Sequence, residues 1–159
     1  MTDTSCPTLA APTADAMDAI GAALATSLTA GDFIAVSGPL GAGKSHLCRA
    51  IVRAILRDDN AQVPSPSYTL INAYTIGDIE VWHSDLYRIA DAGELSELGL
   101  DDPPANVIVL MEWPERMSTP PSRRAQITIR PQTDDCRLLD LCFWGPGWEN
   151  LRAQWSRLA

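Results

Sequence analysis

The sequence contains almost no lysine. Twelve of its 159 residues are basic, and eleven of these are Arg, so Lys44 is the only Lys. A compact ammonium and a planar guanidinium are not interchangeable in confined sites. In a chain that otherwise uses Arg throughout, we expect Lys44 to lie where Arg is unacceptable.

Metal-binding and disulfide-forming patterns are also scarce. There are two histidines, and none of the four cysteines forms a C-x-x-C pair, so neither a zinc site nor a disulfide framework is expected. This cysteine usage favours a reducing cytoplasm. No apolar run is long enough to cross a bilayer, and residues 1–14 lack the basic and apolar regions of a secretory signal. A cytoplasmic location is therefore predicted.

The composition predicts one globular domain. The apolar fraction of 46% excludes a largely disordered chain, and the length suits a single core. We expect a flexible N-terminus over residues 1–12 and one domain over residues 13–159.

The negative charge is concentrated in one segment. The formal net charge is -8, and residues 78–115 hold ten acidic residues against Arg88 alone. An acidic chain is a poor candidate for direct binding to nucleic acid. The segment is either an ordinary solvated face or a metal site combined with a surface for a protein partner.

Hydrophobic periodicity predicts an α/β fold. The run at residues 107–111 is apolar throughout, which is typical of a strand covered on both faces, as in a parallel sheet. Helices are expected from residue 13 to about 30, at 44–57, at 91–100 and over about 148–158. The other expected strands are residues 33–36, 125–129 and 137–143, with a hairpin of 68–74 and 79–83.

A phosphate-binding loop lies between the first strand and the second helix. Residues 38–45, Gly-Pro-Leu-Gly-Ala-Gly-Lys-Ser, match the pattern G-x-x-x-x-G-K-[ST]. Such a loop wraps phosphates with backbone N–H groups at a helix N-terminus. Lys44 would contact the β- and γ-phosphates, and Ser45 would ligate Mg²⁺. This pattern accounts for the single Lys.

Two acidic residues follow apolar strands and could complete a nucleotide site. Glu112 ends the buried run and is the candidate for orienting the metal, although a solvent-facing acid is the alternative. Asp85 could belong to the metal shell or position the attacking water. A proline-containing loop over residues 65–68 could bind and release a γ-phosphate through Ser65 and Ser67, or could be a stiff connector.

Four stretches together resemble the TsaE (YjeE) family, the bacterial ATPase component of tRNA threonylcarbamoyladenosine biosynthesis. They are residues 38–45, the segment VPSPSYTL at 63–70, the segment HSDLYR at 83–88 and the segment EWPE at 112–115. The acidic segment at 91–101 also looks similar. Three positions depart from the family's usual residues: Pro39 replaces Asp, and Ser45 and Ser67 each replace Thr.

The resemblance implies a P-loop NTPase-type three-layer fold with a mixed, partly parallel central sheet. It implies ATP and Mg²⁺ as cofactors, weak ATPase activity, and action with two paralogous transferase subunits, so that tRNA is met only indirectly. Catalytic roles fall on Lys44, Asp85 and Glu112, and metal binding on Ser45 and Glu112. The residues expected to hold ATP are Gly38, Leu40, Gly41, Ala42, Gly43, Lys44, Ser45, His46, Ser67 and Trp113. The start of the first helix, residues 13–15, would lie near the base.

Two other functions remain open from the sequence. A small P-loop kinase would need further cations and a lid, for which Arg88, Arg123 and Arg124 are the candidates. A nucleotide sensor that binds ATP without hydrolysing it would differ from the ATPase implied by the resemblance only in turnover. A GTPase is disfavoured because the guanine-specific Asn-Lys-x-Asp motif needs a second Lys.

Overall fold

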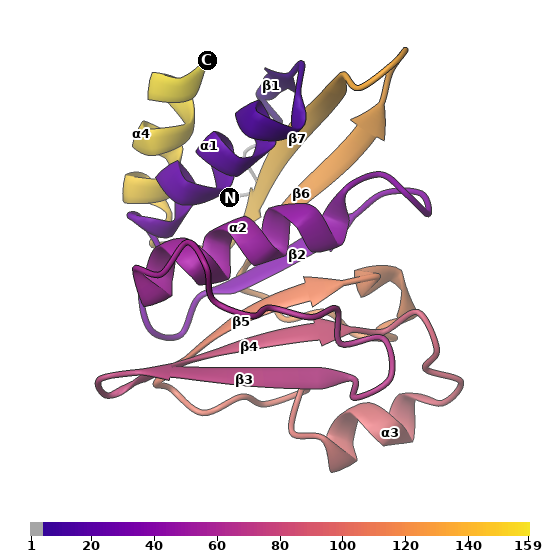
Figure 1. Ribbon diagram of the computed structural model, residues 1–159. Coiled ribbons are helices and arrows are strands. Elements are labelled where there is room, and N and C mark those ends of the chain that lie inside the picture. Colours follow the sequence, from indigo (N-terminus) through magenta and orange to yellow (C-terminus); the bar gives the residue numbers. More distant parts are fainter. Residues whose placement is uncertain (1–4) are drawn as a thin grey trace.

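A mixed seven-stranded sheet forms the centre of the protein. Figure 1 shows the computed structural model, which describes residues 5–159. The strand order is β1-β7-β6-β2-β5-β4-β3, with parallel pairing of β2 to β5 and β6 and of β4 to β5. The strands are β1 (Thr8–Ala11), β2 (Phe33–Ser37), β3 (Ile71–Ile76), β4 (Ile79–Asp85), β5 (Val107–Glu112), β6 (Arg124–Pro131) and β7 (Arg137–Trp144). The expected α/β class and partly parallel sheet are confirmed.

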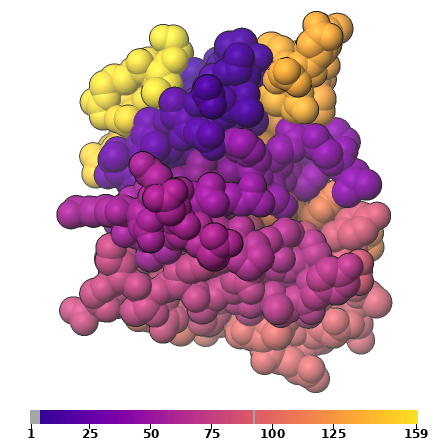
Figure 2. Space-filling model, in the orientation of Figure 1, coloured from indigo at the N-terminus to yellow at the C-terminus, as the bar shows by residue number. Residues whose placement is uncertain are grey.

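Helices cover the two faces of the sheet unequally. One core joins a sheet face to α1 (Ala14–Ala25), α2 (Lys44–Leu56) and α4 (Glu149–Leu158), which Figure 1 shows together on one side. In the same orientation, the space-filling view shows the side chains of α1 and α2 as a continuous cover (Figure 2). A smaller core on the other face contains Leu95 of α3 (Ala92–Glu97) and the flanking Leu86 and Leu100.

The central strands are apolar because both of their faces are buried. In β2, Ile34 and Val36 belong to the larger core, whereas Phe33 and Ala35 belong to the smaller one. All six residues of β5 are buried, as the continuous apolar run predicts. The parallel register places Glu112 opposite Val36 on one side and Asp85 on the other.

The expected helices and the hairpin are present, with small differences in their bounds. Thr13 caps α1, its side chain accepting a hydrogen bond from the backbone N–H of Ala16. The strand expected from residue 68 begins instead at Ile71, because the preceding segment turns: Leu70 N–H donates to Pro66 O, and Leu70 has a positive φ of 67°. None of the helices in the described part of the chain has the length and apolarity needed to cross a membrane.

The N-terminal segment is more ordered than expected. Residues 8–11 form β1, which pairs with β7 at the edge of the sheet and buries Leu9 and Ala11. Residues 1–4 lie outside the described residues. The same pairing places Cys6 opposite Cys142, and the two form a disulfide. The expectation of no disulfide was therefore wrong, and the cysteines no longer argue for a reducing compartment.

Candidate functional site

A cavity of about 320 Å³ lies where the central parallel strands end and α2 begins. Ligands of α/β proteins bind at the carboxyl ends of parallel strands, so this is the expected place for a site. The lining residues are Leu40, Gly41, Ala42, Gly43, Lys44, Ser45, His46, Ser65, Ser67, Asp85, Tyr87, Glu112 and Trp113. Four separate stretches of the sequence thus meet at one cavity.

The loop at residues 38–43 has a backbone that requires glycine at particular positions. Gly38 has φ of 149°, and a Cβ there would lie 2.7 Å from the carbonyl oxygen of Ile129. Gly43 has φ of 106° immediately before the first turn of α2. Substitution at either glycine would disturb the path that carries the chain from β2 into α2.

Lys44 is folded back onto this loop. Its Nζ donates hydrogen bonds to the carbonyl oxygens of Gly38, at 2.7 Å, and Pro39, at 2.8 Å, and lies 4.1 Å from the centre of the Trp113 ring. Burial lowers the pKa of the ammonium group, while the charges of Glu112 and Asp85 act in the opposite direction. The residue is only 5% exposed, so the cation is largely buried at the wall of the cavity.

Trp113 forms a wall of the cavity beside this cation. It has a positive φ of 58°, which is uncommon for a residue other than glycine. Its ring packs against that of Tyr87, with the centroids 4.9 Å apart. Local backbone strain of this kind clusters at functional sites.

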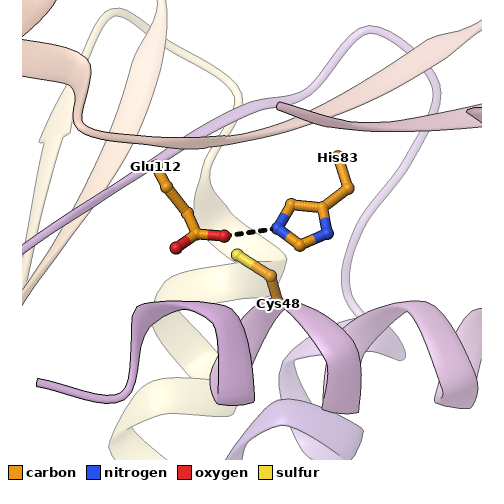
Figure 3. Close-up of side chains that lie close together, drawn as sticks. All are labelled: Cys48, His83 and Glu112. Atoms are coloured by element: carbon orange, nitrogen blue, oxygen red, sulfur yellow. Dashed lines mark hydrogen bonds and ion pairs between the residues drawn. The ribbon is translucent and has the colours of Figure 1, made fainter. Parts of the chain in front are cut away.

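Glu112 is the most heavily hydrogen-bonded acid of the cavity. The Ser45 hydroxyl, in the first turn of α2, lies 2.8 Å from one carboxylate oxygen and 3.0 Å from the other. His83 Nε2 lies 2.6 Å from Glu112 Oε2, and Cys48 of α2 lies beside both side chains (Figure 3). Burial, with the charges of Glu112 and Asp85, raises the pKa of the Cys48 thiol well above its usual range.

Asp85 faces the same cavity from the end of β4. Its carboxylate accepts hydrogen bonds from the Tyr87 backbone N–H, at 2.9 Å, and from the Ser67 hydroxyl, at 3.4 Å. Burial raises the pKa of Asp85, and the charge of Glu112 acts in the same direction. The cavity therefore brings together two acids and one cation, and such groups with shifted pKa values in one cavity mark a candidate functional site.

A second cavity of about 210 Å³ adjoins the first. It shares Ala42, Gly43 and His46 with the first cavity and is also lined by Thr13, Ala14, Met17, Asp135 and Arg137. Arg137 of β7 donates through Nε to the carbonyl oxygen of Ala42 at 3.0 Å. The start of α1 and the β6–β7 hairpin thus meet beside the loop.

The structure brings nearly all the sequence-predicted site residues to these cavities. Of the residues expected to act in catalysis or to hold ATP and the metal, only Gly38 does not line the first cavity, and its carbonyl oxygen accepts from Lys44 instead. Of residues 13–15, expected near the base, Thr13 and Ala14 line the second cavity. Sequence reasoning missed His83, Tyr87 and Arg137. His83 and Tyr87 each stand two residues from Asp85, so the alternation of strand β4 could have directed attention to His83. Nothing in the sequence around Arg137 pointed to the loop.

Comparison with known proteins identifies a family. The family model "Threonylcarbamoyl adenosine biosynthesis protein TsaE" matches residues 11–139. A curated relative from Rickettsia felis, named tRNA threonylcarbamoyladenosine biosynthesis protein TsaE, is 35% identical over 101 residues, which is 62% of this chain and 58% of that protein. A protein of the same name from Nostoc is 39% identical over 116 residues, 69% of each chain.

A solved structure shares the fold. The crystal structure of Bacillus subtilis YdiB superposes with a TM-score of 0.73 at 24% identity, covering 99% of this chain and 97% of that one. The match to the Rickettsia relative spans less than two thirds of that protein's length. The likeness in structure extends over almost the whole chain, and the family model matches most of it.

Proposed function

The chain belongs to the TsaE family of tRNA threonylcarbamoyladenosine biosynthesis proteins, and from this premise we propose that it is a Mg²⁺-dependent ATP-binding protein with weak ATPase activity. Its hydrolysis of ATP would support threonylcarbamoylation of the adenosine beside the anticodon of tRNA. The transferase chemistry would belong to two paralogous partner subunits, and this chain would meet tRNA only through them. We interpret residues 13–159 as one P-loop ATPase domain with an NTPase-type three-layer fold.

The observation that carries the proposal is the meeting of Lys44, Ser45, Asp85 and Glu112 at one cavity. The backbone of residues 38–43 and the N-terminus of α2 would receive the phosphates. Lys44 would exchange its two carbonyl partners for phosphate oxygens. The second cavity, at the start of α1, would receive the base.

The donors around Ser45 suit Mg²⁺. The Ser45 hydroxyl and the Glu112 carboxylate offer oxygen ligands, which Mg²⁺ prefers, and the hydrogen bond between them keeps them together. Mg²⁺ bound there would neutralise charge on the phosphates. Asp85 would orient the attacking water, and Ser67, bonded to Asp85, would link that position to the loop at residues 65–68.

An acidic surface around α3 suits a protein partner better than RNA. It comprises Asp91, Glu94, Glu97, Asp101 and Asp102, of which all but Glu94 are exposed. Phosphates would be repelled by this surface, whereas a basic protein surface would be attracted. We therefore assign it as a candidate docking site for one of the transferase subunits.

The arrangement of the arginines argues against the kinase alternative. Among the described residues that line the first cavity, Lys44 is the only Lys or Arg. Arg88 stacks on the exposed ring of Tyr68 at 4.5 Å, Arg123 pairs with Asp32, and Arg124 stacks on Trp144. These candidates for a kinase lid are engaged elsewhere.

The test is ATP hydrolysis by the purified full chain, alone and with the two expected partner subunits. Lys44→Ala and Glu112→Ala should each abolish the Mg²⁺-dependent hydrolysis of the reconstituted complex. Glu149→Ala removes an exposed acid from α4 and is the matched control. Unchanged turnover in either site variant would refute the role assigned to that residue.

A pull-down with the partner subunits, with and without ATP, tests the second half of the proposal. We expect binding that depends on the nucleotide. Absence of any nucleotide-dependent binding would contradict the role in tRNA modification. Phosphorylation of a small acceptor would favour the kinase instead.

A further inference from the structure

His83 is a buried histidine aimed at the acid of the candidate metal site. It lies on β4, two residues before Asp85, and its side chain is 1% exposed. Figure 3 shows its ring directed at Glu112, with Nε2 2.6 Å from Oε2. Since a carboxylate can only accept, the ring nitrogen donates this hydrogen bond.

This hydrogen bond determines how the Glu112 carboxylate is presented. Ser45 approaches the carboxylate from α2, and His83 approaches Oε2 from the neighbouring strand. Held by Ser45 alone, the carboxylate could turn about its last torsion, which has only a broad preference. With His83 on Oε2, the position of Oε1 beside Ser45 is fixed as well.

Packing alone does not explain a histidine at this position. Its other ring nitrogen, Nδ1, is buried and has no hydrogen-bond partner within the part of the chain that the structure describes. A buried polar atom without a partner costs about 1–3 kcal/mol. An apolar side chain would avoid that cost, so the contact with Glu112 is what the histidine supplies.

We propose that His83 is a positioning residue, which orients Glu112 for Mg²⁺ held by Glu112 and Ser45. The inference rests on the proposed function, because it assumes that nucleotide binds at this cavity with Mg²⁺. Hydrogen-bond partners behind a metal ligand fix its orientation, and their loss commonly lowers metal affinity about 10–100-fold. His83 acts through Glu112 and needs no contact with the nucleotide.

The cluster offers a second interpretation that the experiment must separate. Single ligand atoms of Cys48, His83 and Glu112 lie within 4.8 Å of one another and could hold an ion directly. In that case Cys48 would be as important as His83. If His83 acts by positioning Glu112, Cys48 is a packing neighbour and its sulfur is dispensable.

The test compares His83→Gln with His83→Asn in the full chain. The amide nitrogen of Gln can stand where His Nε2 stands, whereas that of Asn is too short to reach Glu112. The readouts are the Mg²⁺ concentration giving half-maximal tightening of ATP binding, measured by calorimetry, and ATP affinity in EDTA. Cys48→Ala is the matched control for loss of volume in the same cluster.

We expect His83→Asn to raise the half-saturating Mg²⁺ concentration at least about tenfold, with ATP affinity in EDTA within about threefold of the unaltered chain. His83→Gln and Cys48→Ala should both stay within about threefold in both readouts. A thermal melt of each variant shows that it is folded before the titration.

Three results would overturn the proposal. The first is an unchanged Mg²⁺ requirement in His83→Asn, and the second is an equal loss in the Gln and Asn variants. The third is Co²⁺ binding with a thiolate absorption band that Cys48→Ala removes, which would make the cluster itself a metal site. If the unaltered chain binds no ATP, the proposed function fails, and the role of His83 fails with it.

Discussion

Replacement of Lys44 by Arg tests whether the single lysine is required for its shape rather than for its charge. Lys44 is only 5% exposed. Its Nζ atom lies between two carbonyl oxygens, at 2.7 and 2.8 Å, and the Trp113 ring, whose centre is 4.1 Å away. A guanidinium is wider and planar, and excess volume in a packed site costs about 1–3 kcal/mol. We therefore expect Lys44→Arg to displace the loop or to point its charge away from the phosphates.

The expected loss of nucleotide affinity follows from the removal of a buried charged contact. Such a loss costs about 2–5 kcal/mol, which at 1.4 kcal/mol per factor of ten weakens binding about 30-fold or more. The assay is calorimetric titration of ADP and ATP with Mg²⁺. Lys44→Arg should resemble Lys44→Ala, although it keeps the positive charge.

A reciprocal exchange provides the control. Arg53, on α2 well beyond the loop, donates to the carbonyl oxygen of Ala61, and Arg53→Lys should leave nucleotide affinity unchanged. Binding by Lys44→Arg within about threefold of the unaltered chain would refute the reasoning. The scarcity of lysine would then reflect composition alone.

Three further predictions concern charge, crosslinking and packing. Burial raises the pKa of Asp85 above its ordinary 3.8, so the folded state favours the protonated carboxyl group. The stability that this gives is fully present below pH 3.8 and is lost as pH rises through the raised pKa. Asp85→Asn should therefore unfold at a higher temperature than the unaltered chain at pH 7, and the difference should close toward pH 4. A lower melting temperature of the variant at pH 7 would contradict this stability prediction. The variant should also fail to hydrolyse ATP. Thiol titration of the denatured, unreduced protein should find two free thiols, because Cys6 and Cys142 are joined, and four thiols would refute the disulfide. Reduction of the disulfide should lower the free energy of unfolding by about 2–4 kcal/mol. A Cβ on Gly21 would lie 2.6 Å from the Cβ of Ala50, so Gly21→Ala should destabilise the protein by about 1–3 kcal/mol in chemical denaturation. Adding Ala50→Gly to this variant should restore part of the lost stability. An unaffected Gly21→Ala variant would show that α1 and α2 can separate freely.

Residues close together in the sequence were predictable, and those joined across the fold were less so. The loop at residues 38–45 needs only consecutive backbone groups, and its motif is complete in the sequence. Glu112 and Asp85 were predictable because an acid after an apolar run marks the carboxyl end of a strand. Their closeness to each other depends on the register of β4 against β5, which the apolar runs do not specify.

The features that the sequence did not predict, strand β1, the disulfide and the role of His83, share one cause. Strand β1 has four residues with only Leu9 and Ala11 buried, too short a pattern to separate from a loop, and it exists because β7 lies beside it. Cys6 and Cys142 are 136 positions apart and meet only through that pairing. His83 was hidden for a similar reason, because its contact with Glu112 crosses from one strand to the next.

The order of the central strands also bears on when the protein becomes able to bind its ligand. Lys44, Asp85 and Glu112 meet only after β5 has paired with both β2 and β4. Such non-local pairings form slowly, because long chain segments must be ordered first. A chain still leaving the ribosome cannot assemble the cavity before residue 112 has emerged. Once assembled, the cavity links ligand to folding, since ligand at 100 times its dissociation constant adds about 2.7 kcal/mol to the free energy of unfolding. If the cavity binds nucleotide as proposed, cellular nucleotide would therefore stabilise the folded chain against unfolding.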